Sequence, residues 1–176
     1  AFDALVREGR VLHVAMSNTT GERLAESLEF AQREGLAAYE WLQPHYNLVE
    51  RAGYEEEFAP VVSRFGLDVA PYYALASGFL TGKYRTGSAD GESPRAAKAA
   101  SYLDARGEAV LAALDEVAAD LDVPVAAVAI AWLLAKPGVT APIASARTVE
   151  QLQAVLPGVS LVLSEDQITR LDEASA

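Results

Sequence analysis

The sequence predicts an α/β fold built on parallel strands. Four short apolar runs alternate with segments in which apolar residues recur at helical spacing, and the runs lead into polar side chains at their C-terminal ends. Strands that alternate with helices form parallel sheets with right-handed crossovers, and ligands bind where such strands end. We therefore expect the polar strand ends to converge on one site.

The strands are predicted from the apolar runs. The first ends in Ser17 and Asn18, the second ends in Gln43, and the fourth leads into Ser145 and Arg147. Hydroxyl, amide and guanidinium groups therefore follow these strands, at the edge where a ligand would lie. The predicted strands cover residues 11–17, 39–43, 67–73 and 140–144.

Helices are predicted between and around these strands. A short helix before the first strand stops at Gly9, and a last helix has Ser164 as its N-cap. The alanine-rich stretch after Pro124 is predicted to be a buried helix, with the proline in its first turn. The other predicted helices cover residues 20–33, 54–64, 105–135 with a break at 122–124, and 149–156, and the last helix covers 165–174.

The most informative segment is residues 71–84, where the third strand runs into a glycine-rich turn that ends in a lysine. Gly78 and Gly82 allow the backbone to approach an anion. Lys83 adds a positive charge to a chain whose formal net charge is −11. Such a turn can bind a phosphate group, or it can simply connect a strand to a helix. The turn alone leaves both alternatives open.

Four motifs, taken in order, resemble the second half of the aldo-keto reductases, the (β/α)8-barrel family that reduces carbonyl groups with NADPH. The resemblance covers nearly the whole chain. It implies half of a TIM (β/α)8 barrel, with parallel strands five to eight and their helices, as one domain over residues 1–176. The motifs are residues 9–18 (GRVLHVAMSN), 42–48 (LQPHYNL), 78–84 (GFLTGKY) and 142–152 (PIASARTVEQL).

The resemblance implies a nicotinamide site at the first strand ends. Ser17, Asn18 and Gln43 fall where the family hydrogen-bonds the carboxamide, which needs both donors and acceptors. Tyr72 falls where an aromatic ring stacks on the nicotinamide. Tyr73 departs from the family pattern and adds bulk beside this pocket.

The resemblance also implies a site for the pyrophosphate along the glycine turn. Leu75, Ser77 and Gly78 would follow the pyrophosphate, and Lys83 would neutralise it. Arg95, in the loop after the turn, would close over the same phosphates.

A third part of the implied site follows the fourth strand. Arg147 and Gln151 fall where the family binds the adenosine 2′-phosphate and the adenine. A planar guanidinium can bind phosphate through two hydrogen bonds, which favours NADP(H) over NAD(H). Ser145 and Val155 depart from the family pattern near this position, as Ala15 does at the first strand, so the adenine contacts are left open.

The catalytic residues of the family are not matched here. The family's tyrosine proton donor, with its lysine, aspartate and histidine, comes from the first half of the barrel. Tyr46 and Tyr72 do not align with that donor. We therefore expect this chain to supply the cofactor-binding half of a reductase that acts on a small aldehyde or ketone, and to be inactive alone. Two alternatives remain: a nucleotide-binding regulatory subunit like the potassium-channel β-subunits, and an unrelated (β/α)8 enzyme.

Length supports the same expectation. A barrel of this type needs roughly 250 residues, and this chain has 176 and does not begin with methionine. We expect the natural polypeptide to extend upstream. The missing neighbours of the outer strands would then be supplied either by that N-terminal half or by a second copy in a homo-oligomer.

Composition excludes several classes of function. A pI near 4.6 argues against nucleic-acid and anionic-membrane partners, because both require basic surface. No apolar run is long enough for a membrane span, and we expect a cytoplasmic protein. The chain has no cysteine, which excludes disulfides and thiolate sites. No metal site is expected.

The two histidines, an acidic run and a long loop are the remaining features. His13 is expected inside an apolar strand, whereas His45 either supports or lines the substrate pocket. The acidic run at residues 55–57 is expected to open a helix, where negative charge suits the helix dipole. Residues 85–101 are predicted to be a long loop, either a lid over the site or a disordered segment.

Overall fold

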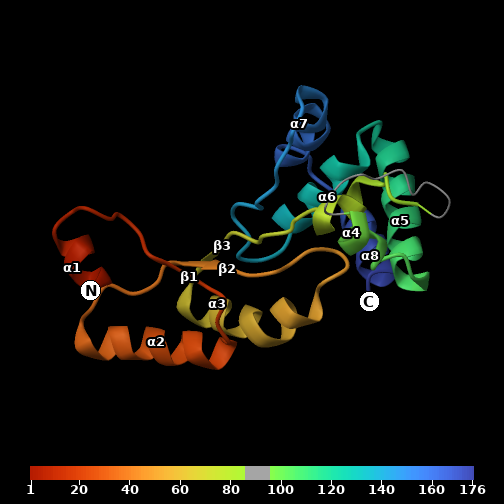
Figure 1. The fold of residues 1–176 in the computed structure, drawn as a ribbon. Coiled ribbons are helices and arrows are strands. Elements are labelled where there is room, and N and C mark those ends of the chain that lie inside the picture. The colour runs from red at the N-terminus through yellow and green to blue at the C-terminus, as the bar shows by residue number, and fades with distance from the viewer. Residues whose placement is uncertain (86–95) are drawn as a thin grey trace.

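The computed structural model describes residues 1–85 and 96–176, and its centre is a small parallel sheet (Figure 1). The strands lie in the order β1-β2-β3, and helices lie between them along the chain. The predicted α/β fold is therefore confirmed. The strands are β1 (Ala15–Ser17), β2 (Trp41–Gln43) and β3 (Asp68–Val69).

Helices α2 and α3 of the N-terminal part pack against one face of the sheet. Figure 1 shows α2 and α3 below the strands. Thr20 caps α2 by accepting a hydrogen bond from the backbone N–H of Arg23 at 3.2 Å. The helices of this part are α1 (Phe2–Arg7), α2 (Gly21–Glu34), the π-helical η1 (Gly53–Phe58) and α3 (Ala59–Phe65).

The predicted helix at residues 54–64 divides into η1 and α3. Pro60 stands in the first turn of α3. A proline has no N–H for an α-helical bond to the residue four before it, and the turn that precedes Pro60 is widened to π-helical geometry. The carboxylate of Glu57 accepts a hydrogen bond from the backbone N–H of Gly21 at 2.7 Å and so joins η1 to α2.

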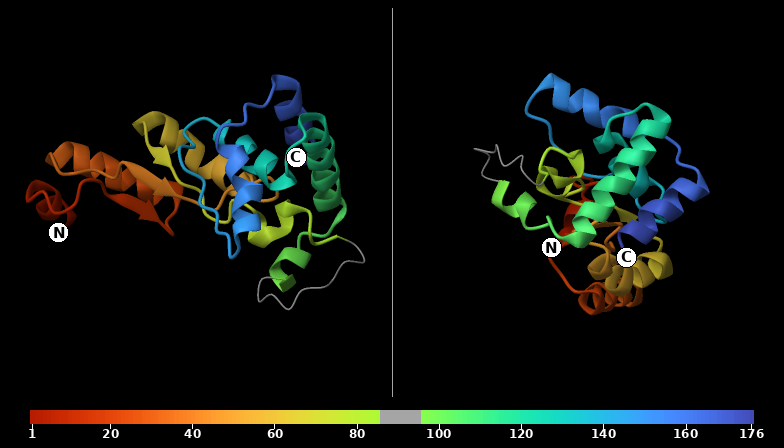
Figure 2. Two further views of the ribbon diagram at one scale, coloured as in Figure 1. Left: turned by 90° about the horizontal axis from the view of Figure 1, so that it is seen from above. Right: turned by 90° about the vertical axis from the view of Figure 1, so that its right-hand side faces the viewer.

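The C-terminal part is a group of packed helices. Figures 1 and 2 show α5, α6 and α8 together at the end of the molecule away from α1. Residues 126–133 of α6 are buried, as the alanine-rich sequence predicts. The elements of this part are η2 (Ala76–Thr81), α4 (Ala96–Ala100), α5 (Ala105–Leu121), α6 (Val125–Leu134), α7 (Val149–Val155), η3 (Leu156–Val159) and α8 (Glu165–Ala174).

Two further predictions for this part, an N-cap and a loop, are tested directly. Ser164 caps α8 in a reciprocal capping box with Gln167, which confirms the predicted N-cap. The prediction of a continuous loop over residues 85–101 is wrong at its end, where α4 forms a short helix of four alanines and Lys98. Residues 86–95 of that loop lie outside the described residues.

In the described part of the chain, no single helix is long and apolar enough to cross a membrane. Helices α5 and α6 are long and apolar enough only when they are counted together, and the chain bends by 98° between them.

The strand predicted at residues 140–144 is wrong. Val139 makes one isolated parallel bridge with Val69, and the N–H groups of Thr140 and Ile143 donate to the carbonyl oxygens of Val69 and Pro71 at 2.9 and 2.8 Å. Pro142 has no N–H group and interrupts any regular ladder. This segment therefore follows β3 without forming a strand.

The other strands are shorter than predicted. β1 and β2 each keep only the last three residues of the predicted range, and β3 keeps two residues near the start of its range. Beyond β3, Tyr72 makes a single isolated bridge with His45. His13 lies before β1 rather than inside a strand. It is exposed, with Nδ1 2.7 Å from Oε2 of Glu40.

The register of the sheet separates a covered face from an open one. Met16, Leu42 and Val69 are register partners, and the last two are buried in the core with residues of α2 and α3. Ala15 and Asp68 belong to the alternate row and are exposed. Successive side chains point to opposite faces of a strand. One face of the sheet therefore packs against helices while its other face meets solvent.

A charged cluster joins the loop after β2 to the C-terminal helix. The guanidinium of Arg51 donates to both carboxylate oxygens of Glu55, at 2.9 and 3.1 Å. It also donates to the carbonyl oxygen of Asp172 at 2.9 Å and to Oγ of Ser175 at 2.8 Å. These contacts hold α8 against the N-terminal part of the chain.

The same cluster reaches α6 and the core. Asp172 accepts hydrogen bonds from Nε1 of Trp132 at 2.9 Å and from Nζ of Lys136 at 2.6 Å. The hydroxyl of Tyr46 donates to Glu55 at 2.8 Å. Burial, together with this hydrogen bond, raises the pKa of Tyr46 far above its usual range. The hydroxyl therefore remains protonated as a donor.

Gly158 tests how tightly α7 and η3 pack on α6. A Cβ at this position would lie 2.9 Å from Cβ of Ile130 and still closer to the carbonyl oxygen of Ala127. We expect Gly158→Ala to lower the free energy of unfolding by about 1–3 kcal/mol, because the backbone of α6 must move. Urea unfolding of the chain would measure this change.

Gly53→Ala is the matched control. Gly53 also lies in a helix, but a Cβ there meets nothing within 4 Å. Alanine should leave stability unchanged or raise it by up to about 1 kcal/mol through helix propensity. Equal destabilisation by the two substitutions would contradict the packing explanation.

Candidate functional site

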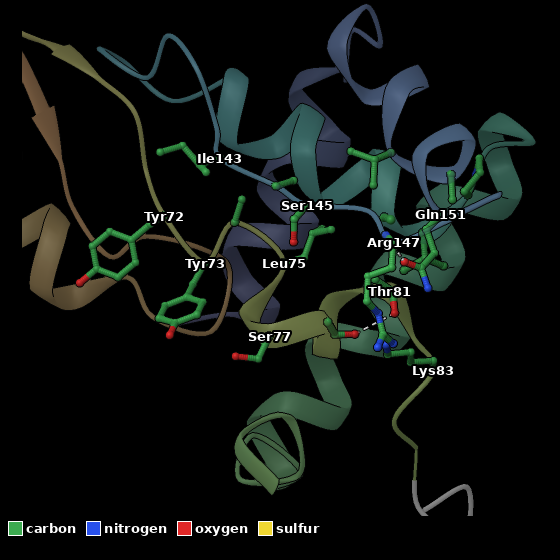
Figure 3. Close-up of a pocket in the computed structure, with 18 of the residues that line it drawn as sticks. Tyr72, Tyr73, Leu75, Ser77, Thr81, Lys83, Ile143, Ser145, Arg147 and Gln151 are labelled. Atoms are coloured by element: carbon green, nitrogen blue, oxygen red, sulfur yellow. Dashed lines mark hydrogen bonds between the residues drawn. The ribbon is translucent and has the colours of Figure 1, made fainter. Parts of the chain in front are cut away.

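A cavity of about 1090 Å³ lies where the strands end. It is formed by the ends of β1 and β2, the glycine turn, the start of α6 and the segment that leads into α7 (Figure 3). Every described residue of the predicted cofactor site lines it. These are Ser17, Asn18, Gln43, Tyr72, Leu75, Ser77, Gly78, Lys83, Arg147 and Gln151. The remaining predicted residue, Arg95, lies outside the described residues.

The ends of β1 and β2 bring polar groups together. Ser17 and Gln43 are register partners, and Oγ of Ser17 donates to the carbonyl oxygen of Gln43 at 3.0 Å. Asn18 follows with a φ of 53° and also lines the cavity. Hydroxyl and amide groups are thus available to one ligand at this end.

Aromatic rings form the neighbouring wall. Tyr72 stacks on His45 with ring centroids 5.3 Å apart and planes inclined by 13°. Burial lowers the pKa of His45, so its imidazole is neutral at pH 7. His45 therefore supports the lining residue Tyr72 and is not among the described residues that line this cavity.

The glycine turn has the close backbone approach that the sequence predicts. Gly78 and Gly82 have φ values of 96° and 75°. A Cβ at Gly78 would lie 3.2 Å from Cε of Lys83. The hydroxyl of Thr81 donates to the carbonyl oxygen of Gly78 at 2.7 Å and closes the turn. The turn therefore depends on glycine both for its backbone angle and for its space.

The segment before α7 presents the second cationic side chain. The backbone N–H of Arg147 donates to Oε1 of Gln151 at 2.9 Å, and Thr148 caps the helix by accepting from the N–H of Gln151 at 3.3 Å. These local bonds fix the backbone from which the exposed Arg147 side chain extends. Figure 3 shows Lys83, Arg147 and Gln151 toward one end of the cavity.

The two ends of the cavity therefore differ in chemistry. Tyr72, Tyr73 and Ile143 lie toward the end opposite the cationic side chains (Figure 3). A ligand that fills the whole cavity would combine an anionic part with a flat or apolar part.

Several lining residues are not part of the sequence prediction. The first turn of α6 contributes Pro124, Val125 and Ala126, and Pro124, its N-cap, makes no side-chain cap hydrogen bond. The predicted helix break at residues 122–124 marks this helix start, but no residue type there indicates a ligand. The others are Tyr73, Ala74, Thr81, Ile143, Ala144, Ser145, Ala154 and Val155.

Unusual backbone conformations gather at the site. Asn18, Tyr73, Ala76 and Ser77 have φ values between 48° and 59°, although none is glycine. Three of them line the cavity. Such conformations cost about 1–3 kcal/mol each and persist where the surrounding structure enforces them, most often at functional sites.

Among the described residues, no group of three or more histidine and acidic side chains could hold a metal ion. Within the predicted acidic run, Glu55 binds Arg51 and Tyr46, and Glu57 binds the N–H of Gly21. These contacts are structural.

Comparison with known families identifies the chain. The model of the Aldo/keto reductase family matches residues 1–176. The chain belongs to the aldo/keto reductase family.

Individual relatives carry oxidoreductase and channel-subunit names. The chain is 32% identical to an uncharacterized oxidoreductase, YrpG, of Bacillus subtilis, over 98% of this chain and 52% of that protein. It is 31% identical to a probable voltage-gated potassium channel subunit beta of Oryza sativa, over 86% and 48%. An aldo-keto reductase of Fusarium vanettenii is 29% identical over 100% and 47%. The chain spans about half the length of these relatives.

Proposed function

We propose that this chain is the cofactor-binding half of an NADP(H)-dependent aldo-keto reductase. One observation carries the proposal: every described residue of the predicted cofactor site lines the same cavity. This cavity has aromatic rings at one end and two cationic side chains at the other. A nicotinamide dinucleotide has the matching arrangement of a flat ring, a pyrophosphate and a phosphorylated adenosine.

The residues present fit such a cofactor. Gly78 leaves a space beside Lys83 that a Cβ would fill, which suits close approach of phosphate oxygens to the backbone. Arg147 can bind a phosphate through two hydrogen bonds. The volume of about 1090 Å³ exceeds the usual range for a small ligand and suits a dinucleotide.

Each part of the site has a separate task in this proposal. Ser17, Asn18 and Gln43 orient the carboxamide, and Tyr72 supports one face of the nicotinamide ring. When bound, NADPH supplies the hydride that reduces the carbonyl carbon of an aldehyde or ketone. Leu75 and Ser77 line the path of the pyrophosphate along the glycine turn.

We further propose that the sheet is half of a barrel. β1 pairs with β2 alone among the described strands, and the row of Ala15 and Asp68 is exposed. A first half of the barrel would cover this face and supply the tyrosine proton donor with its lysine, aspartate and histidine. The coverage of about half of each relative supports this interpretation.

A nucleotide-binding regulatory subunit is the second candidate. It is favoured by the relative from Oryza sativa that is named as a channel β-subunit. The cofactor site would be the same in both cases. Turnover of a simple aldehyde by a complete barrel separates an enzyme from a subunit that only binds the nucleotide.

Arg147→Ala tests the cofactor. We expect the affinity for NADPH to fall by roughly 1–3 kcal/mol, the scale of a lost charged hydrogen bond, while the affinity for NADH stays nearly unchanged. Titration of both nucleotides, followed by fluorescence, measures the difference. Arg10→Ala removes an exposed arginine outside the cavity and is the control. Equal losses for both nucleotides would count against the assignment.

The chain alone should not oxidise NADPH in the presence of aldehydes, because the proton donor and its helpers are absent. The absorbance of NADPH, followed with a purified sample, measures this. Turnover above background that disappears on Tyr72→Phe would contradict the expectation, since it would identify a proton donor inside this chain.

The open face and free edge of the sheet should drive association. Unpaired strand edges and uncovered inner faces favour pairing with another chain. We expect the purified chain to sediment as a species heavier than its 18.7 kDa monomer. A cooperatively folded monomer at micromolar concentration would show that the face needs no cover.

A further inference from the structure

Tyr73 forms an exposed aromatic surface inside the cavity. Half of its surface is exposed (50%), and it lies beside Tyr72 and Ile143, toward the end opposite the cationic side chains (Figure 3). In the proposed function this end receives the nicotinamide and the carbonyl substrate. Tyr72 is assigned to the nicotinamide, which leaves Tyr73 without a role in cofactor binding.

The backbone of Tyr73 is held in an unfavourable conformation by a buried amide. Its φ is 54°, a value that bulky residues rarely adopt. The carbonyl oxygen of Tyr73 accepts a hydrogen bond from Nδ2 of Asn47 at 2.9 Å and another from the N–H of Ala76 at 2.7 Å. Asn47 is fully buried, and its Oδ1 accepts from the N–H of Val49 at 2.9 Å. Both sides of the Asn47 amide are therefore used, and the carbonyl of Tyr73 is fixed.

The ring of Tyr73 contacts two neighbouring rings. It meets Tyr72 edge to face at 5.3 Å and 66°, and it meets His45 at 5.4 Å and 65°. Because His45 also stacks on Tyr72, the three rings hold one another. Aromatic pairs prefer such edge-to-face and offset geometries. Tyr73 thus presents a rigid flat surface, and binding a ligand against it requires little further ordering of the side chain.

We infer that Tyr73 is a specificity-determining residue, whose fixed ring in the cavity favours carbonyl substrates that carry an aromatic ring. This inference rests on the proposed function, because it takes the cavity to hold a carbonyl substrate beside the nicotinamide. The carbonyl group would face the nicotinamide on Tyr72, and the ring of the substrate would pack against Tyr73. An aromatic pair adds about 2- to 10-fold in affinity beyond burial of area.

Two matched ketones test the inference. Acetophenone and cyclohexyl methyl ketone share a six-membered ring and the same carbonyl group, but only the first ring is aromatic. The saturated ring is the more hydrophobic of the two, so burial of apolar area alone predicts the opposite order. NMR titration of the 176-residue chain with saturating NADP⁺, which cannot donate a hydride, gives both dissociation constants.

We expect the chain to bind acetophenone about 2- to 10-fold more tightly than the cyclohexyl ketone. Tyr73→Leu should abolish or reverse this preference, and Tyr73→Phe should retain it. Phe30→Leu is the control, because Phe30 is equally exposed (49%) on α2 and lies outside the cavity. Equal affinities in the wild-type chain, or an unchanged ratio in Tyr73→Leu, would overturn the inference.

A second measurement covers the case in which Tyr73→Leu does not fold. In the wild-type chain, acetophenone should shift the ring-proton resonances of Tyr73 and leave those of Phe30 unchanged. Absence of a shift at Tyr73 would overturn the inference without any variant.

A separate titration keeps the two proposals apart. Failure of NADP⁺ to bind the wild-type chain would count against the proposed function. In that case the dissociation constants of the two ketones are compared without nucleotide. A preference for acetophenone that the wild-type chain shows and Tyr73→Leu loses still supports the role of Tyr73. Equal dissociation constants in the wild-type chain still overturn it.

Discussion

The guanidinium of Arg51 joins the two parts of this molecule. It follows the loop that leaves β2, and it binds the carboxylate of Glu55 together with the carbonyl of Asp172 and the hydroxyl of Ser175 on the C-terminal side. Removing one partner from a buried pair costs about 3–5 kcal/mol, and the cost here is lower because the carboxylates of Glu55 and Asp172 are about a third exposed. Without this contact, the loop after β2 would lose its polar connection to the C-terminal helix.

The cavity requires the two parts to be held together, because its walls come from both. Ser17 and Gln43 belong to the sheet, whereas Arg147 and Gln151 belong to the segment that packs on α6. The glycine turn lies between them and is strained at several residues. The packing on either side of the turn offsets the cost of these conformations. Strained residues at functional sites are commonly stabilised by the surrounding structure in this way.

The polar residues at the ends of β1 and β2 can be predicted from the sequence, because an apolar run followed by a polar residue is easy to recognise. Ser17 and Gln43 therefore line the cavity, and Arg147 lines it too, although no strand forms at residues 140–144 before it. The prediction of a strand at residues 140–144 is wrong because it followed the apolar residues of this segment and did not take into account that Pro142 interrupts a regular ladder. Tyr73 could not be predicted to take a positive φ, since that conformation depends on a hydrogen bond from Asn47, which lies 26 residues away.

The spread of the cavity lining along the chain has a thermodynamic consequence. Residues from Ser17 to Val155 meet around one volume, so the unfolded chain has no counterpart of this site. Any ligand that binds there adds RT ln(1 + [L]/Kd) to the free energy of unfolding, about 2.7 kcal/mol at a hundredfold excess over Kd. Occupancy and folding are therefore linked. The sheet of this chain is open on one face. The fraction of the chain that is folded therefore depends on the concentration of the ligand.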